Sequence, residues 1–112
     1  MLERITRRSV FRRFAPPAPR FRRGPFTVVV AERDADEGAG AGAATAIGRR
    51  VGPAVVRNRL RRQVRAILAE LDRERPIRPG WYLVIVNPDA RGRSYADLSE
   101  DLRGAFDRAI GR

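Results

Sequence analysis

The apolar run from Trp81 to Val86 places the strongest constraint on how this chain can fold. Its six residues, WYLVIV, are all apolar, and successive side chains of a strand point to opposite faces of a sheet. A strand with one face in water alternates apolar and polar residues, whereas a continuous apolar run is typical of a strand covered on both faces. We therefore predict a central strand over about 81–87, with other elements packed on both sides of it.

The longest helix is predicted just after Gly52 and Pro53, which suit a helix cap and a first helical residue. Apolar side chains then recur at helical spacing from Val56 to Leu71. This pattern predicts an amphipathic helix over about 53–71.

A terminal helix is predicted over about 95–110, because Ser94 and Asp97 form a capping pattern ahead of an apolar stripe. Composition and turn residues define the other elements. We expect a short N-terminal helix over about 6–14, strands over about 25–31 and 43–47, and an extra short strand near 20–23. The chain 1–112 is thus predicted to be one α+β domain, a two-layer sandwich with the order α-β-β-α-β-α.

The positive charge of the chain is concentrated in one region. The formal net charge is +11, all 24 basic residues are arginine, and most of the excess lies before residue 66. Seven arginines fall between residues 49 and 65, and no acid lies between Glu37 and Glu70. Most charge runs are simply solvated faces, but like charges at i, i+4 on a helix repel each other. We therefore expect this region to bind a polyanion, with Arg49 and Arg50 just ahead of the helix.

The sequence offers little for catalysis. It contains no cysteine and no histidine, which removes thiolate nucleophiles and the commonest general base. The tightest acidic cluster outside the last helix, Asp34, Asp36 and Glu37, lies in a glycine-rich loop that we expect to serve solubility. We predict no catalytic and no metal-binding residues. With no long apolar run and no signal-peptide pattern, we expect a cytoplasmic protein without a membrane partner.

The segment 46–65, AIGRRVGPAVVRNRLRRQVR, resembles the signature of the bacterial ribonuclease P protein subunit. The order of elements around it is similar too, and the resemblance covers nearly the whole chain. It implies a left-handed β-α-β crossover, as in the ribosomal-protein-like domain that the family shares, although such crossovers are right-handed in about 98% of cases.

The resemblance also implies a function and two sets of site residues. Members of the family bind the catalytic RNA of ribonuclease P and the 5′ leader of precursor tRNA, and they assist tRNA 5′ maturation. The RNA subunit carries the chemistry and binds most of the Mg²⁺, so that the protein needs no cofactor and no obligate protein partner. The catalytic RNA would contact Arg57, Asn58, Arg59, Arg61, Arg62 and Arg65. A cleft for the leader would be lined by Phe11, Thr27, Val29, Ala46, Arg49 and Arg50.

Other interpretations remain open at this point. From the residues alone, Phe11 is more readily a core residue than a ligand contact. An architectural RNA-binding protein of the ribosomal type would share the charge and the fold class. A helix-turn-helix DNA-binding protein is less favoured, because two strands flank the basic helix.

Overall fold

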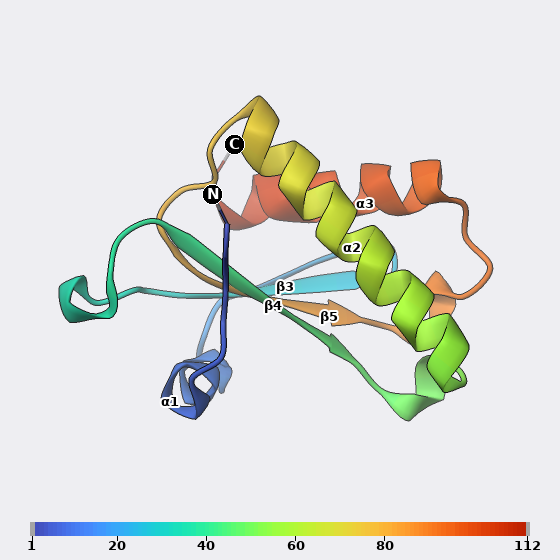
Figure 1. Cartoon of the computed structure of the whole chain (residues 1–112), viewed down its shortest axis with the longest axis horizontal. Helices are drawn as coiled ribbons and strands as arrows, with labels where there is room; N and C mark the ends of the chain where they lie inside the picture. Colours follow the sequence, from blue (N-terminus) through green and yellow to red (C-terminus); the bar gives the residue numbers. More distant parts are fainter. Residues whose placement is uncertain (1, 112) are drawn as a thin grey trace.

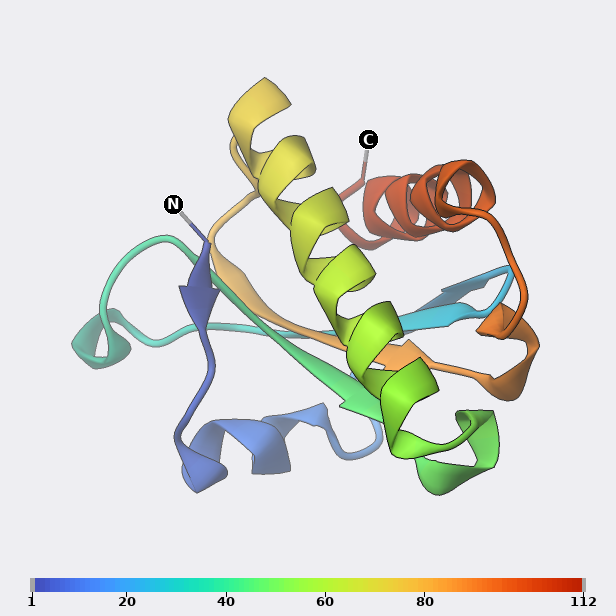
Figure 2. The same ribbon diagram turned by 45° about the vertical axis from the view of Figure 1, so that its right-hand side comes forward.

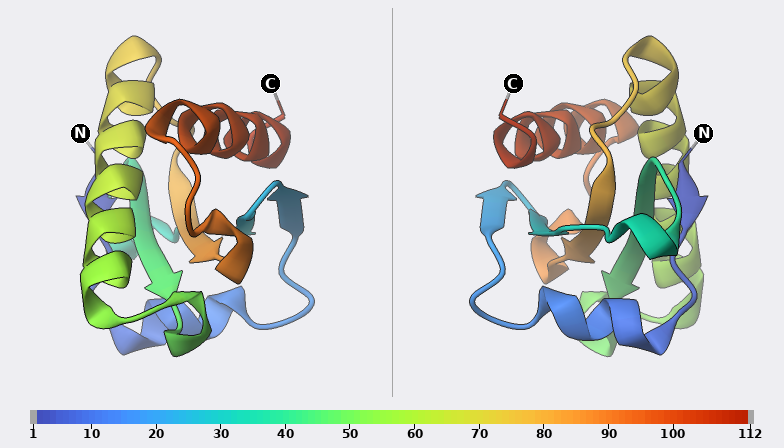
Figure 3. Two further views of the ribbon diagram at one scale, coloured as in Figure 1. Left: turned by 90° about the vertical axis from the view of Figure 1, so that its right-hand side faces the viewer. Right: turned by 90° about the vertical axis from the view of Figure 1, so that its left-hand side faces the viewer.

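The computed structural model describes residues 2–111 and contains one five-stranded mixed sheet with the strand order β1-β4-β5-β3-β2. The strands are β1 (Glu3–Arg4), β2 (Arg20–Arg23), β3 (Phe26–Ala31), β4 (Ala41–Ile47) and β5 (Gly80–Val86). The α-helices are α1 (Arg8–Phe11), α2 (Ala54–Glu74) and α3 (Tyr95–Ala109). Single 3₁₀ turns are η1 (Arg12–Phe14), η2 (Ala35–Glu37), η3 (Arg49–Val51) and η4 (Pro88–Ala90). Helices α2 and α3 cover one face of the sheet, and α1 lies on the other (Figures 1 and 3). The predicted α+β class is confirmed.

Strand β5 is central, as its apolar run predicts. It pairs in parallel with β4 and antiparallel with β3. On the inner face, its residues Tyr82, Val84 and Val86 pack against the apolar stripes of α2 and α3. The ring centroids of Tyr82 and Phe106 lie 5.4 Å apart. This inner layer is the main hydrophobic core, and it fixes both helices on the sheet.

The outer face of the sheet carries a second, smaller core. Trp81 of β5 packs there with Val29 of β3, and with Ile5, Val10 and Phe14 of the N-terminal segment. All five are buried. Helix α1 has only four residues, far too few to be stable alone, so this cluster is what holds it on the sheet.

The connection from β4 through α2 to β5 joins two adjacent parallel strands. When the sheet is viewed face-on from the side that carries α2, with β4 pointing upward, β5 lies to the left of β4 (Figures 1 and 3). The crossover is therefore left-handed, as the resemblance implies and contrary to the usual preference.

Several predicted boundaries were wrong. The strand β1 was not predicted, because two charged residues carry no strand signal; it pairs in parallel with β4 at the edge of the sheet (Figure 2). The N-terminal helix starts at Arg8 rather than near residue 6, and it tightens into η1. Helix α2 starts one residue later than predicted, with Pro53 as its cap, and it continues to Glu74. The short strand near 20–23 and the Ser94 cap of α3 are confirmed.

Candidate nucleic-acid interface

The first half of α2 carries a surface of arginines that have no acidic partner. We call this surface the arginine face; it consists of Arg57, Asn58, Arg59, Arg61, Arg62 and Arg65. Within residues 2–111, none of its arginines forms an ion pair within 4.0 Å. Arg57, Arg61 and Arg65 stack at i, i+4, an arrangement that costs about 0.2–0.5 kcal/mol for each like-charge pair. No acidic side chain within the described residues reduces this repulsion.

Two contacts set the orientation of arginines on this face. The Nε of Arg57 donates to the carbonyl of Gly52 at 3.1 Å, which leaves its two terminal nitrogens for another acceptor. The side-chain amide oxygen of Asn58 accepts from Arg61 at 3.3 Å. The arginine face is thus partly ordered before any ligand arrives.

The second half of α2 is neutralised by α3. Arg103 of α3 donates to both carboxylate oxygens of Glu74, at 2.6 and 3.1 Å, and to Glu70 at 3.3 Å. The Tyr95 hydroxyl donates to Glu70 at 3.0 Å. The hydrogen bonds from Arg103 lower the pKa of the Glu74 carboxyl. Glu70 and Glu74 are therefore directed toward α3, away from the arginine face.

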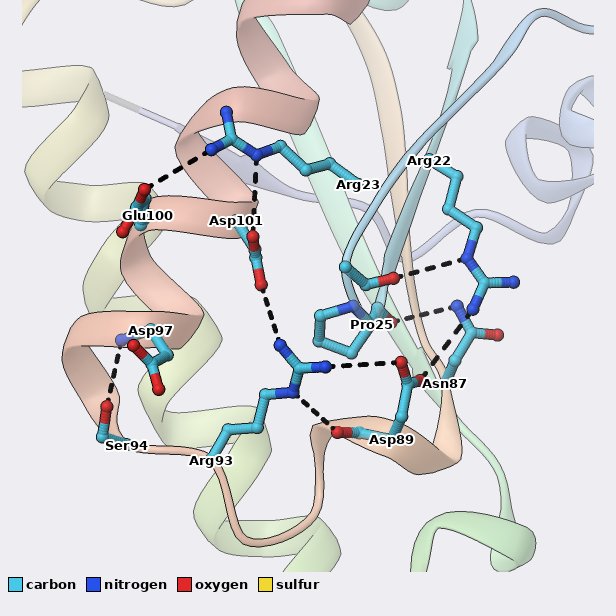
Figure 4. A network of polar contacts seen from close by, with 11 residues as sticks. Arg22, Arg23, Pro25, Asn87, Asp89, Arg93, Ser94, Asp97, Glu100 and Asp101 are labelled. Carbon is cyan, nitrogen blue, oxygen red and sulfur yellow. Dashed lines mark hydrogen bonds and ion pairs between the residues drawn. The ribbon is translucent and has the colours of Figure 1, made fainter.

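Arginines near the start of α3 are paired as well (Figure 4). Arg93 contacts Asp101 at 3.2 Å and Asp89 at 3.7 Å, and its Nε donates to the Asp89 carbonyl. Arg23 of β2 reaches Glu100 and Asp101, both at 3.6 Å. Such exposed pairs add little stability individually, but their carboxylates neutralise positive charge in this region. The arginines of the arginine face, in contrast, have no acidic partner among residues 2–111.

Five of the six residues predicted to line a cleft fall into three groups. Thr27 and Ala46 lie in one row across the outer face, because both are in register with Ile85 of β5. Arg49 and Arg50 are exposed in η3, directly after β4. Phe11 is 40% exposed and meets the buried Phe14 edge-on, with ring centroids 6.3 Å apart. Phe11 is therefore a surface aromatic and Phe14 the core residue.

Val29 does not lie on an accessible surface. Its side chain is fully buried in the outer cluster, beneath α1 and η1. The prediction that Val29 lines an open cleft is therefore wrong for this structure: apolar side chains fill the space between α1 and this part of the sheet.

The acidic loop, residues 32–40, has a structural role that the sequence did not reveal. Asp34 and Glu37 form a reciprocal capping box around η2. Arg13 of η1 contacts Asp34 and Glu37, both at 2.7 Å, and Trp81 donates from Nε1 to Glu37 at 3.2 Å. The expectation that these acids merely serve solubility is wrong for Asp34 and Glu37, which tie η1 to the sheet.

Arg33 completes this clamp. Its guanidinium carbon lies 4.1 Å from the centroid of the Trp81 ring, and its terminal nitrogen donates to Glu3 of β1 at 2.9 Å. The loop therefore connects β1, η1 and β5. We refer to Arg13, Arg33, Asp34, Glu37 and Trp81 as the loop clamp.

One exposed residue beside the arginine face was missed. Val55 is 74% exposed in the first turn of α2, one helical turn before Asn58 and Arg59. This exposure could have been predicted from the sequence, because Val55 lies outside the apolar stripe of Val56 and Leu60. An apolar side chain held among cations suits contact with a base or a sugar.

Within the described residues, no three side chains of histidine, cysteine, aspartate or glutamate converge as metal ligands. Nor does any helix of residues 2–111 have the length and apolar character needed to cross a bilayer.

The fold and the arginine face define a small basic α+β domain with a strongly cationic surface. The sequence pattern of the Ribonuclease P family matches residues 2–110. The chain belongs to the ribonuclease P protein family.

Known proteins similar to this chain agree with that assignment. A ribonuclease P protein component of Thermus scotoductus is 40% identical over 63 residues, 56% of this chain and 36% of that protein. One from Gluconacetobacter diazotrophicus is 44% identical over 62 residues, 54% of this chain and 53% of that protein. The matched part thus spans about half or less of these relatives.

Solved structures show the same fold. The RNase P protein of Staphylococcus aureus superposes with a TM-score of 0.83 at 19% identity, covering 95% of this chain and 94% of that one. The protein from Thermotoga maritima gives a TM-score of 0.79 at 20% identity, covering 95% and 96%.

The loop clamp predicts a pH response of the single tryptophan. A hydrogen bond from the Asp34 backbone N–H, together with Trp81 and Arg13, lowers the pKa of Glu37 below 4.5. A lowered carboxyl pKa contributes stability above the unfolded-state pKa, and this contribution is lost as the pH falls through the folded-state value. We expect Trp81 fluorescence to change in a step below pH 4.5 as Glu37 is protonated and releases the indole N–H.

Glu37→Gln should abolish this step, because glutamine does not titrate. Asp36→Asn is the matched control: Asp36 is exposed in the same 3₁₀ turn, and its variant should retain the step. An unchanged fluorescence titration in Glu37→Gln would show that the clamp does not depend on the Glu37 charge.

Proposed function

We propose that this chain is the protein subunit of a ribonuclease P, that it binds the catalytic RNA and precursor tRNA, and that it assists 5′ maturation of tRNA in the cytoplasm. The observation that carries the proposal is the arginine face, which has no acidic partner inside the described protein. Membership of the family supports this function over that of a ribosomal-type architectural protein.

The arginine face suits the backbone of a folded RNA. Guanidinium groups bind phosphate oxygens through two parallel hydrogen bonds, and each neutralised phosphate releases condensed counterions. The start of α2 adds to this, because its first turn contains no acid and no side chain caps it. Free N–H groups at a helix N-terminus favour phosphate.

The outer face supplies the second contact in this proposal. Phe11, Thr27 and Ala46 are at least partly accessible there, with Arg49 and Arg50 at the end of β4. An exposed aromatic ring can stack on an unpaired base, and nearby arginines can hold the adjoining phosphates. We propose that this surface holds the 5′ leader of the precursor.

The protein contributes binding rather than bond cleavage in this proposal. Phosphodiester hydrolysis needs an activated water and stabilisation of a charged transition state. The chain has no histidine, and arginine stays protonated at working pH. We propose that the RNA subunit holds the Mg²⁺ ions and performs the chemistry. The arginine face would screen repulsion between the two RNAs and so lower the Mg²⁺ concentration they require.

The arginine face predicts a steep dependence of RNA affinity on salt. Arg61→Ala and Arg62→Ala should each reduce the slope of log K against log salt by about one, for the loss of one phosphate contact. The measurement is binding of the ribonuclease P RNA at several salt concentrations. Arg78→Ala, a loss of the same charge at an exposed site beyond the far end of α2, is the control and should leave the slope unchanged. Equal slopes in all four proteins would count against the arginine face.

If Phe11 stacks on the leader, the protein should bind precursor tRNA more tightly than mature tRNA, and this preference should depend on Phe11. Phe11→Ala should weaken binding of leader-bearing precursor by about 1–3 kcal/mol, a factor of about 5 to 150, with little effect on mature tRNA. Phe14→Ala is the control, since Phe14 is only 3% exposed; it should lower the melting temperature and weaken both ligands alike. If Phe11→Ala shows that same uniform loss, Phe11 is a core residue.

The proposal that the RNA subunit performs the chemistry can be tested with an activity assay. The purified protein should leave precursor tRNA intact at every Mg²⁺ concentration, and 5′ cleavage should appear once the catalytic RNA is added. Adding the protein should shift the Mg²⁺ dependence of the RNA to lower concentrations. Site-specific 5′ cleavage by RNA-free protein, persisting through repurification, would overturn this assignment.

A further inference from the structure

A row of arginines on α2 continues beyond the arginine face and contains one gap. Positions 57, 61, 65, 69 and 73 follow one another at intervals of four residues, in a row that turns by about 40° around the helix at each step, and all are arginine except Ala69. At 1.5 Å per residue, successive members of the row are about 6 Å apart along the axis. Ala69 is exposed, so its small side chain leaves a break in a wall of guanidinium groups.

This break opens into a groove between α2 and the edge of the sheet. The groove has a volume of about 840 Å³, within the range of sites that hold small organic groups. Figure 2 shows β1 beside β4 at this edge, with α1 below β1 and α2 to its right. Its apolar lining comes from Ile5, Phe11, Ala43, Ala44, Leu68 and Ala69.

The walls of the groove are cationic. Arg61, Arg65 and Arg73 line it from α2, and Arg4 lines it from β1. Arg4 is in register with Ala43, which faces the inner core; the Arg4 side chain therefore lies on the α2 side of the sheet. Within residues 2–111, these four arginines make no ion pair within 4.0 Å.

Two carboxylates also line the groove, but each is engaged elsewhere. Glu3 forms its ion pair with Arg33 of the loop clamp. Asp72 accepts a hydrogen bond from the backbone N–H of Ile77. The groove therefore combines an apolar interior with a positive rim.

We propose that this groove binds one unpaired nucleotide of an RNA strand, with the base inserted at Ala69 and the flanking phosphates on Arg65 and Arg73. An aromatic base suits the apolar lining and the exposed Phe11, and guanidinium groups on both sides suit the negative backbone. RNA is favoured as the occupant because Arg61 and Arg65 belong to both the groove and the arginine face. The proposal rests on the RNA-binding function above and adds a site for a single unstacked base.

Ala69→Leu tests the proposal, because leucine fills the groove without a change of charge. Both residues are strong helix formers, and the site is exposed, so the fold should be retained; the melting temperature and Trp81 fluorescence check this. Ala66→Leu adds the same side chain at an exposed position of α2 that does not line the groove. The probes are a short unstructured RNA, an oligonucleotide of leader sequence, an RNA hairpin with the same number of phosphates, and the ribonuclease P RNA.

We expect Ala69→Leu to bind the unstructured RNA about tenfold more weakly, as for the loss of one stacked base, and to bind the hairpin like the wild type. Ala66→Leu should bind all probes normally. A loss of the same size with the ribonuclease P RNA would assign the nucleotide to the catalytic RNA. A loss confined to an oligonucleotide of leader sequence would assign it to the leader.

Wild-type affinity of Ala69→Leu for every single-stranded probe, or an equal loss in Ala66→Leu, would overturn the groove as a nucleotide site. Those outcomes leave the proposed function intact, provided that the wild type still binds RNA with a steep salt dependence. Absence of salt-dependent RNA binding by the wild type would instead contradict the proposed function itself.

Discussion

Burial of β5 on both faces is the constraint on which the other elements depend. A strand with apolar side chains on both sides needs a layer above it and a layer below it. Helices α2 and α3 provide the inner layer and bury Tyr82, Val84 and Val86. The outer layer is much smaller, and it uses Val10 and Phe14 to cover Trp81. Because the outer layer is short, part of that face stays accessible and can serve for binding.

The distribution of charge follows from this architecture. Helix α3 packs beside the second half of α2, where Arg103 meets Glu70 and Glu74. The first half of α2 has no such neighbour, and its arginines are left to solvent or to a ligand. Like-charge stacking there opposes helix formation, while burial of the apolar stripe of α2 offsets it. The helix is thus held by its apolar side and is free to present a strongly cationic surface.

The sequence predicted the features that depend on periodicity and failed on those that depend on tertiary contacts. The central strand, the two long helices and the Ser94 cap follow from local patterns. The strand β1 could not be predicted, because Glu3 and Arg4 pair with β4 only after the sheet has formed. Val29 was placed in a cleft by resemblance, whereas its burial depends on how α1 is seated. The arginine face could be predicted from the local excess of positive charge. The groove beside Ala69 could not, because it depends on where the edge of the sheet lies relative to α2.

The two edges of the sheet differ in how they are protected from pairing with other chains. Strand β2 is rich in arginine, and charged side chains on an edge strand discourage further pairing. Strand β4 has the sequence AGAATAI, with no charge and small side chains, and such an edge is a template for aggregation. Its first residues are covered by Glu3 and Arg4 of β1, which bring one charge of each sign. Glu3 and Arg4 therefore have two roles, because they line the groove and also place charged side chains beside an uncharged strand. Loss of β1 would remove part of the groove wall and expose the backbone groups of Gly42 and Ala43 to pairing with another chain.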